Sequence, residues 1–162
     1  MAGSLVDRMV GAAFLNIDTY EDVEHDEEAT GQAAAVVVMV AVASAIGGLG
    51  TGAPGALRGA VGSLVGWAVW AGITYLVGTK LFGGTATWGE LLRTLGFANA
   101  PGVLMILGII PFLGRPIMGV VALWVLVASF IGTRQALDFG NAKTFATVLV
   151  GWVCYAILNW IF

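Results

Sequence analysis

The sequence offers few side chains for catalysis or metal binding, and they are far apart. His25 is the only histidine and Cys154 the only cysteine. A histidine-based zinc site or a Ser-His-Asp triad needs partners around the imidazole, and neither can be assembled from the rest of the chain. Cys154 lies in an apolar run, where a lone cysteine behaves as a small hydrophobic residue. We therefore predict no catalytic, cofactor or metal site and no enzymatic activity.

The acidic residues form a cluster near the N-terminus. Seven of the ten Asp and Glu residues lie between Asp18 and Glu28, around His25. Carboxylates attract cations such as Ca²⁺ and Mg²⁺, but the regular ligand spacing of a dedicated calcium loop is missing. We interpret 18–28 as a solvated acidic helix, and the sequence leaves cation binding open.

A polar residue beside a helix breaker lies near the middle of one long apolar run. Asn99 is followed by Pro101 and Gly102, and proline frees a backbone carbonyl that can line a polar cavity inside a membrane. We expect Pro101 to kink its helix and Asn99 to form an interhelical hydrogen bond, with a substrate site as the alternative. The apolar runs lack the Asp and Glu residues that proton-coupled carriers use.

Two pairs of opposite charges lie close to the ends of apolar runs. Glu90 and Arg93 are spaced i, i+3, and Arg134 and Asp138 are spaced i, i+4. Both spacings place the two side chains on one face of a helix, where we expect local ion pairs that anchor the helix ends, with pairing between helices as the alternative. A functional role for Arg134 is the alternative.

These residues must be positioned by membrane-spanning helices. The chain of 162 residues is 59% hydrophobic and 10% charged, with a mean hydropathy of +0.92. Its charges leave five gaps of about 18 residues or more, enough to cross a bilayer as a helix. We predict an all-α protein, a polytopic bundle of five transmembrane helices at about 32–49, 56–82, 90–110, 115–137 and 143–162, which together form the domain 31–162.

One predicted span carries a row of glycines. Gly55, Gly59, Gly62 and Gly66 are spaced four, three and four residues apart, which places them on one face of the second span. In a membrane, small residues allow a second helix to approach closely. We predict helix packing along this face.

Residues 1–30 form the remaining segment, which is amphipathic and acidic. Apolar residues recur at helical spacing on one side, and Asp7, Arg8 and Gly11 lie on the other, which favours a short helix along the membrane interface. The basic residues at span ends predict the orientation: Arg8, Lys80, Arg93, Arg134 and Lys143 share one side, and Arg58 and Arg115 the other. By the positive-inside rule the N-terminus is cytoplasmic and the C-terminus is outside.

The chain also resembles bacterial and archaeal members of the Yip1 family. The residues that carry the resemblance are Lys80-Leu81-Phe82-Gly83-Gly84, Glu90-Leu91-Leu92-Arg93, Phe97-Ala98, Ala100-Pro101, and the block from Trp124 to Arg134-Gln135-Ala136-Leu137. The resemblance implies five spans, a cytoplasmic N-terminus and an outside or luminal C-terminus. Eukaryotic members are linked to vesicle trafficking and Rab-type GTPases, but the Asp-Leu-Tyr-Gly-Pro element of that branch is missing here, so the Rab link is not carried over.

These observations predict a non-enzymatic Yip1-like protein of a prokaryotic cytoplasmic membrane. We expect it to act as a scaffold that organises the membrane or binds partners. The lipid bilayer is the expected surrounding, a second copy or other membrane proteins are the expected partners, and nucleic acid is not. The alternatives are a small channel or carrier that uses the kinked third span, and an accessory subunit of a larger membrane complex. No ligand is indicated.

Overall fold

The computed structural model describes the backbone of residues 3–51 and 53–161 and the side chains of residues 3–49 and 61–154. Within this part the chain is all-helical and contains no strand. The elements are α1 (Leu5–Ala13), α2 (Ile17–His25), α3 (Ala29–Gly47), η1 (Gly48–Thr51), α4 (Ala53–Tyr75), η2 (Leu76–Leu81), α5 (Trp88–Ala98), η3 (Ala100–Ile109), α6 (Gly114–Ala136) and α7 (Asn141–Ile161). Here η1 and η3 are 3₁₀ helices and η2 is a π-helical turn.

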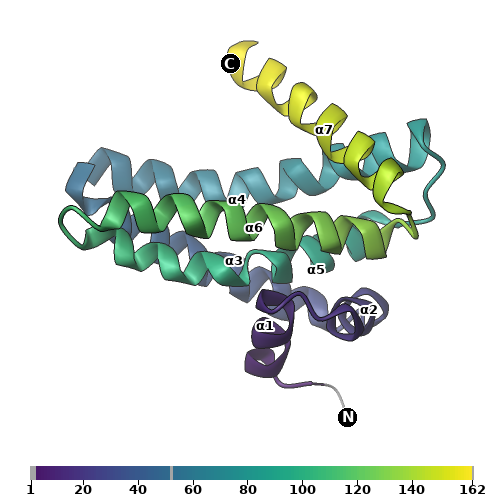
Figure 1. Ribbon diagram of the computed structural model, residues 1–162, viewed down its shortest axis with the longest axis horizontal. Coiled ribbons are helices and arrows are strands. Elements are labelled where there is room, and N and C mark those ends of the chain that lie inside the picture. The colour runs from purple at the N-terminus through teal and green to yellow at the C-terminus, as the bar shows by residue number, and fades with distance from the viewer. Residues whose placement is uncertain (1–2, 52, 162) are drawn as a thin grey trace.

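The long helices lie along one axis and alternate in direction (Figure 1). α3 packs against α4, α5 and η3, and α6 packs against α5 and η3. α7 contacts α4 and α6 near its start and then diverges from the bundle (Figure 1). The short helices α1 and α2 lie beside the bundle, α1 near its middle and α2 toward one end, where α2 contacts α5 and α6.

Among the described residues, three helices are long and apolar enough to cross a membrane, namely Ala29–Gly47, Val61–Leu81 and Gly114–Ala136. The bent pair α5–η3 raises the number to four if it forms one span. The fifth predicted span corresponds to α7, whose side chains beyond Cys154 lie outside the described residues. The helix of the second predicted span begins earlier than about residue 56, because α4 already starts at Ala53. Pro54 therefore falls in the first turn of α4, where a missing N–H costs no helical hydrogen bond.

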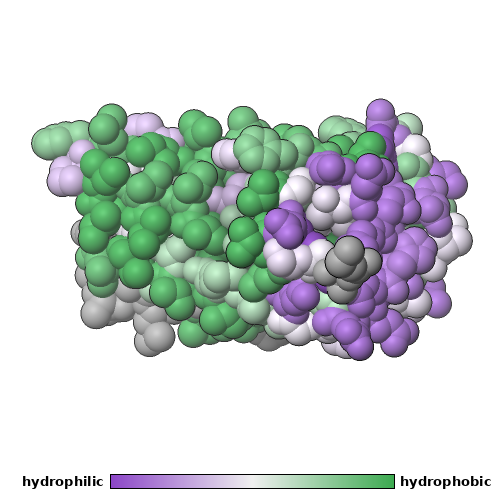
Figure 2. Space-filling view, turned by 90° about the horizontal axis from the view of Figure 1, so that it is seen from below, coloured by the Kyte–Doolittle hydropathy of each residue, from purple (hydrophilic) through white to green (hydrophobic). Residues whose placement is uncertain are grey.

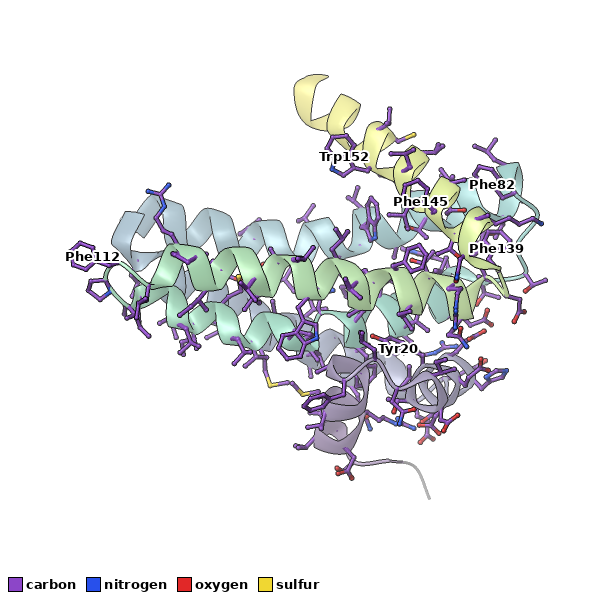
Figure 3. The ribbon with its side chains drawn as sticks, viewed as in Figure 1. Tyr20, Phe82, Phe112, Phe139, Phe145 and Trp152 are labelled. Atoms are coloured by element: carbon purple, nitrogen blue, oxygen red, sulfur yellow. The ribbon has the colours of Figure 1, made fainter. Side chains whose placement is uncertain are left out.

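The surface divides into an apolar part and a polar end (Figure 2). The polar end carries α2, and Figure 3 places Phe82 and Phe139 there, with Phe112 at the opposite end of the bundle. Phe112 belongs to the short connection between η3 and α6 and is 99% exposed. The two ends are thus chemically distinct, as expected for a bundle that crosses a bilayer.

The predicted kink at Pro101 is confirmed. α5 and η3 are bent by 41° at the break between them, and the buried Pro101 lies in the first turn of η3. Proline has no N–H to donate, and its ring clashes with the backbone of a preceding helical turn. The α-helix therefore stops at Ala98.

Close packing around α3 depends on glycines other than those predicted. A Cβ built on Gly96 would lie 2.7 Å from Cβ of Ala33, and one on Gly102 would lie 2.8 Å from Cγ1 of Val40. On Gly47 it would collide with the backbone carbonyl of Met105. Because glycine lacks this atom, α3 lies directly against α5 and η3.

Candidate functional site

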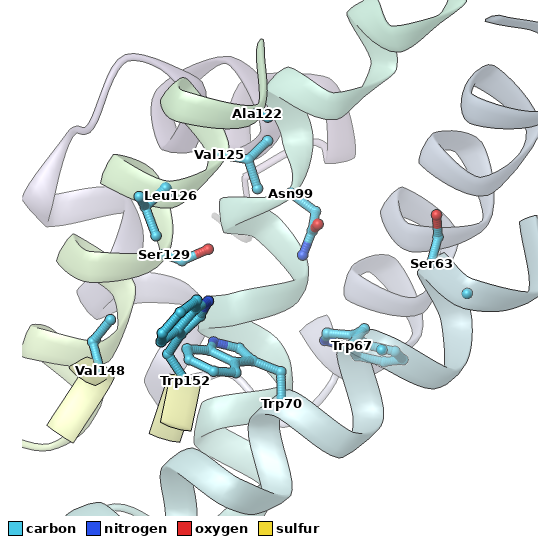
Figure 4. Close-up of a pocket in the computed structure, with 12 residues that line it drawn as sticks. Ser63, Trp67, Trp70, Asn99, Ala122, Val125, Leu126, Ser129, Val148 and Trp152 are labelled. Atoms are coloured by element: carbon cyan, nitrogen blue, oxygen red, sulfur yellow. The ribbon is translucent and has the colours of Figure 1, made fainter. Parts of the chain in front are cut away.

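A groove opens between α4, α6 and α7 and has a volume of about 390 Å³ (Figure 4). α4 contributes Gly62, Ser63, Gly66, Trp67 and Trp70, α6 contributes Ala122, Val125, Leu126 and Ser129, α7 contributes Val148 and Trp152, and Asn99 lies at the break between α5 and η3. The lining is mainly apolar and aromatic with a few polar groups, which is typical of a binding site.

The tryptophans give the groove its shape. The Nε1 of Trp67 donates to the carbonyl of Leu92 at 3.1 Å, so one wall is tied to α5. An indole N–H removed from water needs such a partner. Trp152 is 61% exposed on the diverging helix α7. The aromatic walls were not predicted as part of a site, because the α4 and α7 tryptophans are more than 80 residues apart in sequence.

Asn99 lines the groove, but its hydrogen bond differs from the predicted interhelical one. The Nδ2 of Asn99 donates to the carbonyl of Leu95 at 2.7 Å, within the last turn of α5. The backbone N–H of Asn99 bonds to Gly96 instead of Leu95, which leaves the Leu95 carbonyl available to the side chain. Figure 4 shows the Asn99 amide and the Ser129 hydroxyl pointing into the groove from different elements.

Gly62 and Gly66 lie on the groove wall. No atom of the described chain would lie within 4 Å of a Cβ built on Gly62. Within the described residues, no other helix therefore makes a close contact at Gly62. Gly55 and Gly59 lie outside the residues whose side chains and surroundings are described.

A second polar cluster joins the N-terminal helices to the bundle, and Arg8 is at its centre. Arg8 is only 3% exposed, and its Nη2 lies 2.8 Å from Asp22 and 2.6 Å from Asp26. Its Nη1 donates to Gln32 of α3 at 3.2 Å. The sequence places Arg8 on the polar side of α1. In the structure Arg8 is buried there, because α2 folds over it and two carboxylates, Asp22 of α2 and Asp26 directly after α2, pair with its guanidinium. The hydrogen bond from Arg8 lowers the pKa of Asp26.

Arg93 is buried and contacts backbone carbonyls rather than Glu90. Its Nε donates to the carbonyl oxygens of Val23 and Glu24 at 3.0 and 3.2 Å, and its Nη2 also donates to Glu24. The last carbonyls of a helix have no intrahelical partner, so Arg93 of α5 caps the C-terminal end of α2. Glu90 instead forms a capping box with Thr87 at the start of α5. Instead of the predicted ion pair, Arg93 caps the end of α2 and Glu90 caps the start of α5.

Arg134 and Asp138 also bind other partners. Arg134 donates to Gln135 at 3.1 Å and to Asn141 at 3.2 Å, and Asp138 accepts from Thr85 at 2.8 Å. The predicted pair would need a continuous helix, but α6 ends at Ala136 and Asp138 has a φ of 53°. The i, i+4 geometry is lost at that point.

The burial of Glu24 at the polar end was not predicted. Its side chain lies in the acidic stretch interpreted as solvated, yet the residue is 7% exposed and its buried Oε2 has no hydrogen-bond partner in the described chain. Burial raises the pKa of Glu24 to about 7. The interpretation of 18–28 as fully solvated is therefore wrong at Glu24, since α2 packs this face against α5 and α6.

Comparison with known protein families gives one finding. A family model described as the Yip1 domain matches residues 13–162. No curated protein and no solved structure matches the chain.

Proposed function

The chain belongs to the Yip1 domain family, and we propose that it is a non-enzymatic integral membrane protein that acts as a scaffold. It associates laterally with a second copy or with other membrane proteins through the groove between α4, α6 and α7. The observation that carries this proposal is the open glycine face at Gly62. A glycine that no described residue of the chain covers is available to a helix from another molecule.

The chemistry of the groove supports a helical partner. Gly62 and Gly66 have the four-residue spacing that lets two transmembrane helices approach closely. Lipid tails are as apolar as leucine, so association in a membrane depends on van der Waals packing and not on hydrophobic burial. The flat faces of Trp67, Trp70 and Trp152 provide large contact areas beside the glycines.

In this proposal α7 is the fifth span of a prokaryotic cytoplasmic membrane protein. The polar end with α2 faces the cytoplasm together with the N-terminus, and the C-terminus lies outside. α1 then lies along the interface: Val6, Val10 and Phe14 are at least 50% exposed and follow one another at i, i+4 and i+8.

The experiment is a matched pair of glycine substitutions. Gly62→Leu fills the groove, whereas Gly119→Leu adds the same side chain on α6 outside it. No described atom lies within 4 Å of a Cβ at either position, so both variants should keep the wild-type melting temperature. We expect Gly62→Leu to lower lateral association at least about tenfold and Gly119→Leu to leave it unchanged, measured by energy transfer between labelled copies and by co-purification in mild detergent. Equal association of wild type and Gly62→Leu in both assays would refute a role for the groove.

A small carrier or channel is the second candidate, because Asn99 places an amide in the same groove. Flux measurements in liposomes test it directly. A carrier that uses this site requires solute flux with the wild-type protein and its loss with Asn99→Leu. An accessory subunit of a larger complex would instead appear as a stoichiometric partner in the co-purification.

A further inference from the structure

Three potential metal ligands share one face of α2 at the polar end. Glu21, Glu24 and His25 are spaced i, i+3 and i+4, so their side chains lie next to each other on the helix. One ligand atom from each residue lies within 4.8 Å of the other two. Glu21 and His25 are exposed, so an ion in solution can reach them.

The buried carboxylate of Glu24 is a separate observation that points to a ligand. Its Oε2 is inaccessible to water and has no hydrogen-bond partner in the described residues. Nearly all buried polar atoms in proteins are paired, and an unpaired carboxylate oxygen is costly. Arg93 does not fulfil this need, because its donors are directed at backbone carbonyls and at Thr30.

The neighbouring groups orient the other two ligands. The Nδ1 of His25 lies 2.8 Å from the carbonyl oxygen of Glu21, so Nδ1 carries the proton and Nε2 presents its lone pair. The Nε2 of Gln135 donates to one oxygen of Glu21 at 2.6 Å and leaves the second oxygen to a metal. Such bonds are typical of the residues that support metal ligands.

Two further carboxylates lie near Glu24. The carboxylates of Glu90 and Asp138, from the start of α5 and the end of α6, act on Glu24 through their charge. The C-terminal end of α6 points to the same region, and the negative end of its dipole adds to the attraction.

We propose that Glu21, Glu24 and His25 bind one divalent transition-metal ion, with Zn²⁺ as the favoured ion. One imidazole nitrogen and two carboxylate oxygens suit Zn²⁺, whereas Ca²⁺ and Mg²⁺ prefer oxygen ligands alone. Water completes the coordination. All three ligands belong to α2, so the ion would brace the last turn of this helix, and Gln135 of α6 would support the ligand Glu21 by its hydrogen bond. This site is independent of the groove and of its proposed partner.

The test is Zn²⁺ titration of the full chain in detergent, by competition with a fluorescent chelator. The affinity tag must contain no histidine, because the chain has only one. We expect one ion per chain, and Glu24→Gln and His25→Gln should each weaken binding by at least about tenfold. The matched controls are Glu27→Gln and Glu28→Gln, two exposed acids of the same stretch outside the ligand set. These variants should bind as the wild type does.

A second readout is thermal stability with and without Zn²⁺. Saturating Zn²⁺ should raise the melting temperature of the wild type and of the controls but not that of His25→Gln. His25 is exposed, so this variant remains informative if Glu24→Gln fails to fold. The proposal is overturned if no Zn²⁺ binds, if the controls weaken binding as much as Glu24→Gln does, or if millimolar Mg²⁺ displaces the ion.

Discussion

The buried side chain of Arg93 holds α2 against α5. At the residue scale it is one of two buried arginines in the described chain, and each holds the N-terminal helices in a different way. Arg8 is paired with two carboxylates, whereas Arg93 caps the end of α2 from a different helix. The docking of α2 therefore depends on α5, about 70 residues away in sequence.

The first prediction concerns this cap. Arg93→Met keeps an unbranched apolar side chain but leaves the carbonyls of Val23 and Glu24 without their donor. Each buried carbonyl that loses its partner costs about 1–3 kcal/mol, so we expect a loss of about 2–5 kcal/mol in the free energy of unfolding. The measurement is denaturation in mixed micelles, together with protease cleavage within α2.

Arg134→Met is the control for the cap. Arg134 bonds to side chains only, namely Gln135 and Asn141, and we expect it to contribute less than about 1 kcal/mol. If both variants lose the same stability and α2 stays protected from protease, Arg93 is not a cap.

At the element scale, α3 is the helix around which the bundle packs, and glycines set its distance from η3. The two helices approach most closely at Gly47, where the backbone of Met105 occupies the space that a side chain would need. Backbone atoms cannot rotate away as a flexible side chain can. A small substitution therefore forces a shift of the whole of η3.

We predict that Gly47→Ala is destabilising by about 1–3 kcal/mol or more, because overpacking displaces backbone. Gly72→Ala in α4 is the matched change, since no described atom lies within 4 Å of a Cβ there. We expect this second variant to be neutral or up to about 1 kcal/mol more stable, as alanine favours a helix more than glycine does. Thermal unfolding in detergent compares the two. Similar melting temperatures for both variants would contradict the close approach of α3 and η3.

At the scale of the whole molecule, the alternation of helix directions places the connections at two opposite ends. Thr85 lies at the polar end, bonded to Asp138, and Phe112 lies at the other end. A chain with five spans must then have its termini on opposite sides of the membrane. The side of the membrane on which each terminus lies can be measured without knowing any partner.

The topology prediction uses single cysteines in a Cys154→Ala background. An impermeant maleimide added outside cells should label Phe112→Cys, which is fully exposed, and label Thr85→Cys only after the membrane is opened. In the proposed topology α7 carries the C-terminus out, so a C-terminal alkaline phosphatase fusion should be active. An inactive fusion combined with external labelling at residue 112 would mean that α7 does not span the membrane.

Much of the architecture could be predicted from the sequence, because the bilayer imposes it. Charge-free runs of sufficient length must form helices, since lipid offers no partner to a free backbone amide. The break at Pro101 was equally predictable, because proline interrupts an α-helix wherever it lies. The capping box of Thr87 and Glu90 follows from local spacing in the same way.

Only the tertiary structure decided the partners of the charged residues and the surroundings of the glycines. The i, i+3 spacing suggested that Arg93 pairs with Glu90, yet α2 presents unpaired carbonyls that bind its guanidinium more completely. Spacing alone also could not tell which glycines face a helix and which face a groove: Gly47 and Gly62 both lie in apolar helices, but only Gly47 lies against another backbone. Local patterns fix backbone conformation, whereas burial and pairing depend on helices that meet only after the chain has folded.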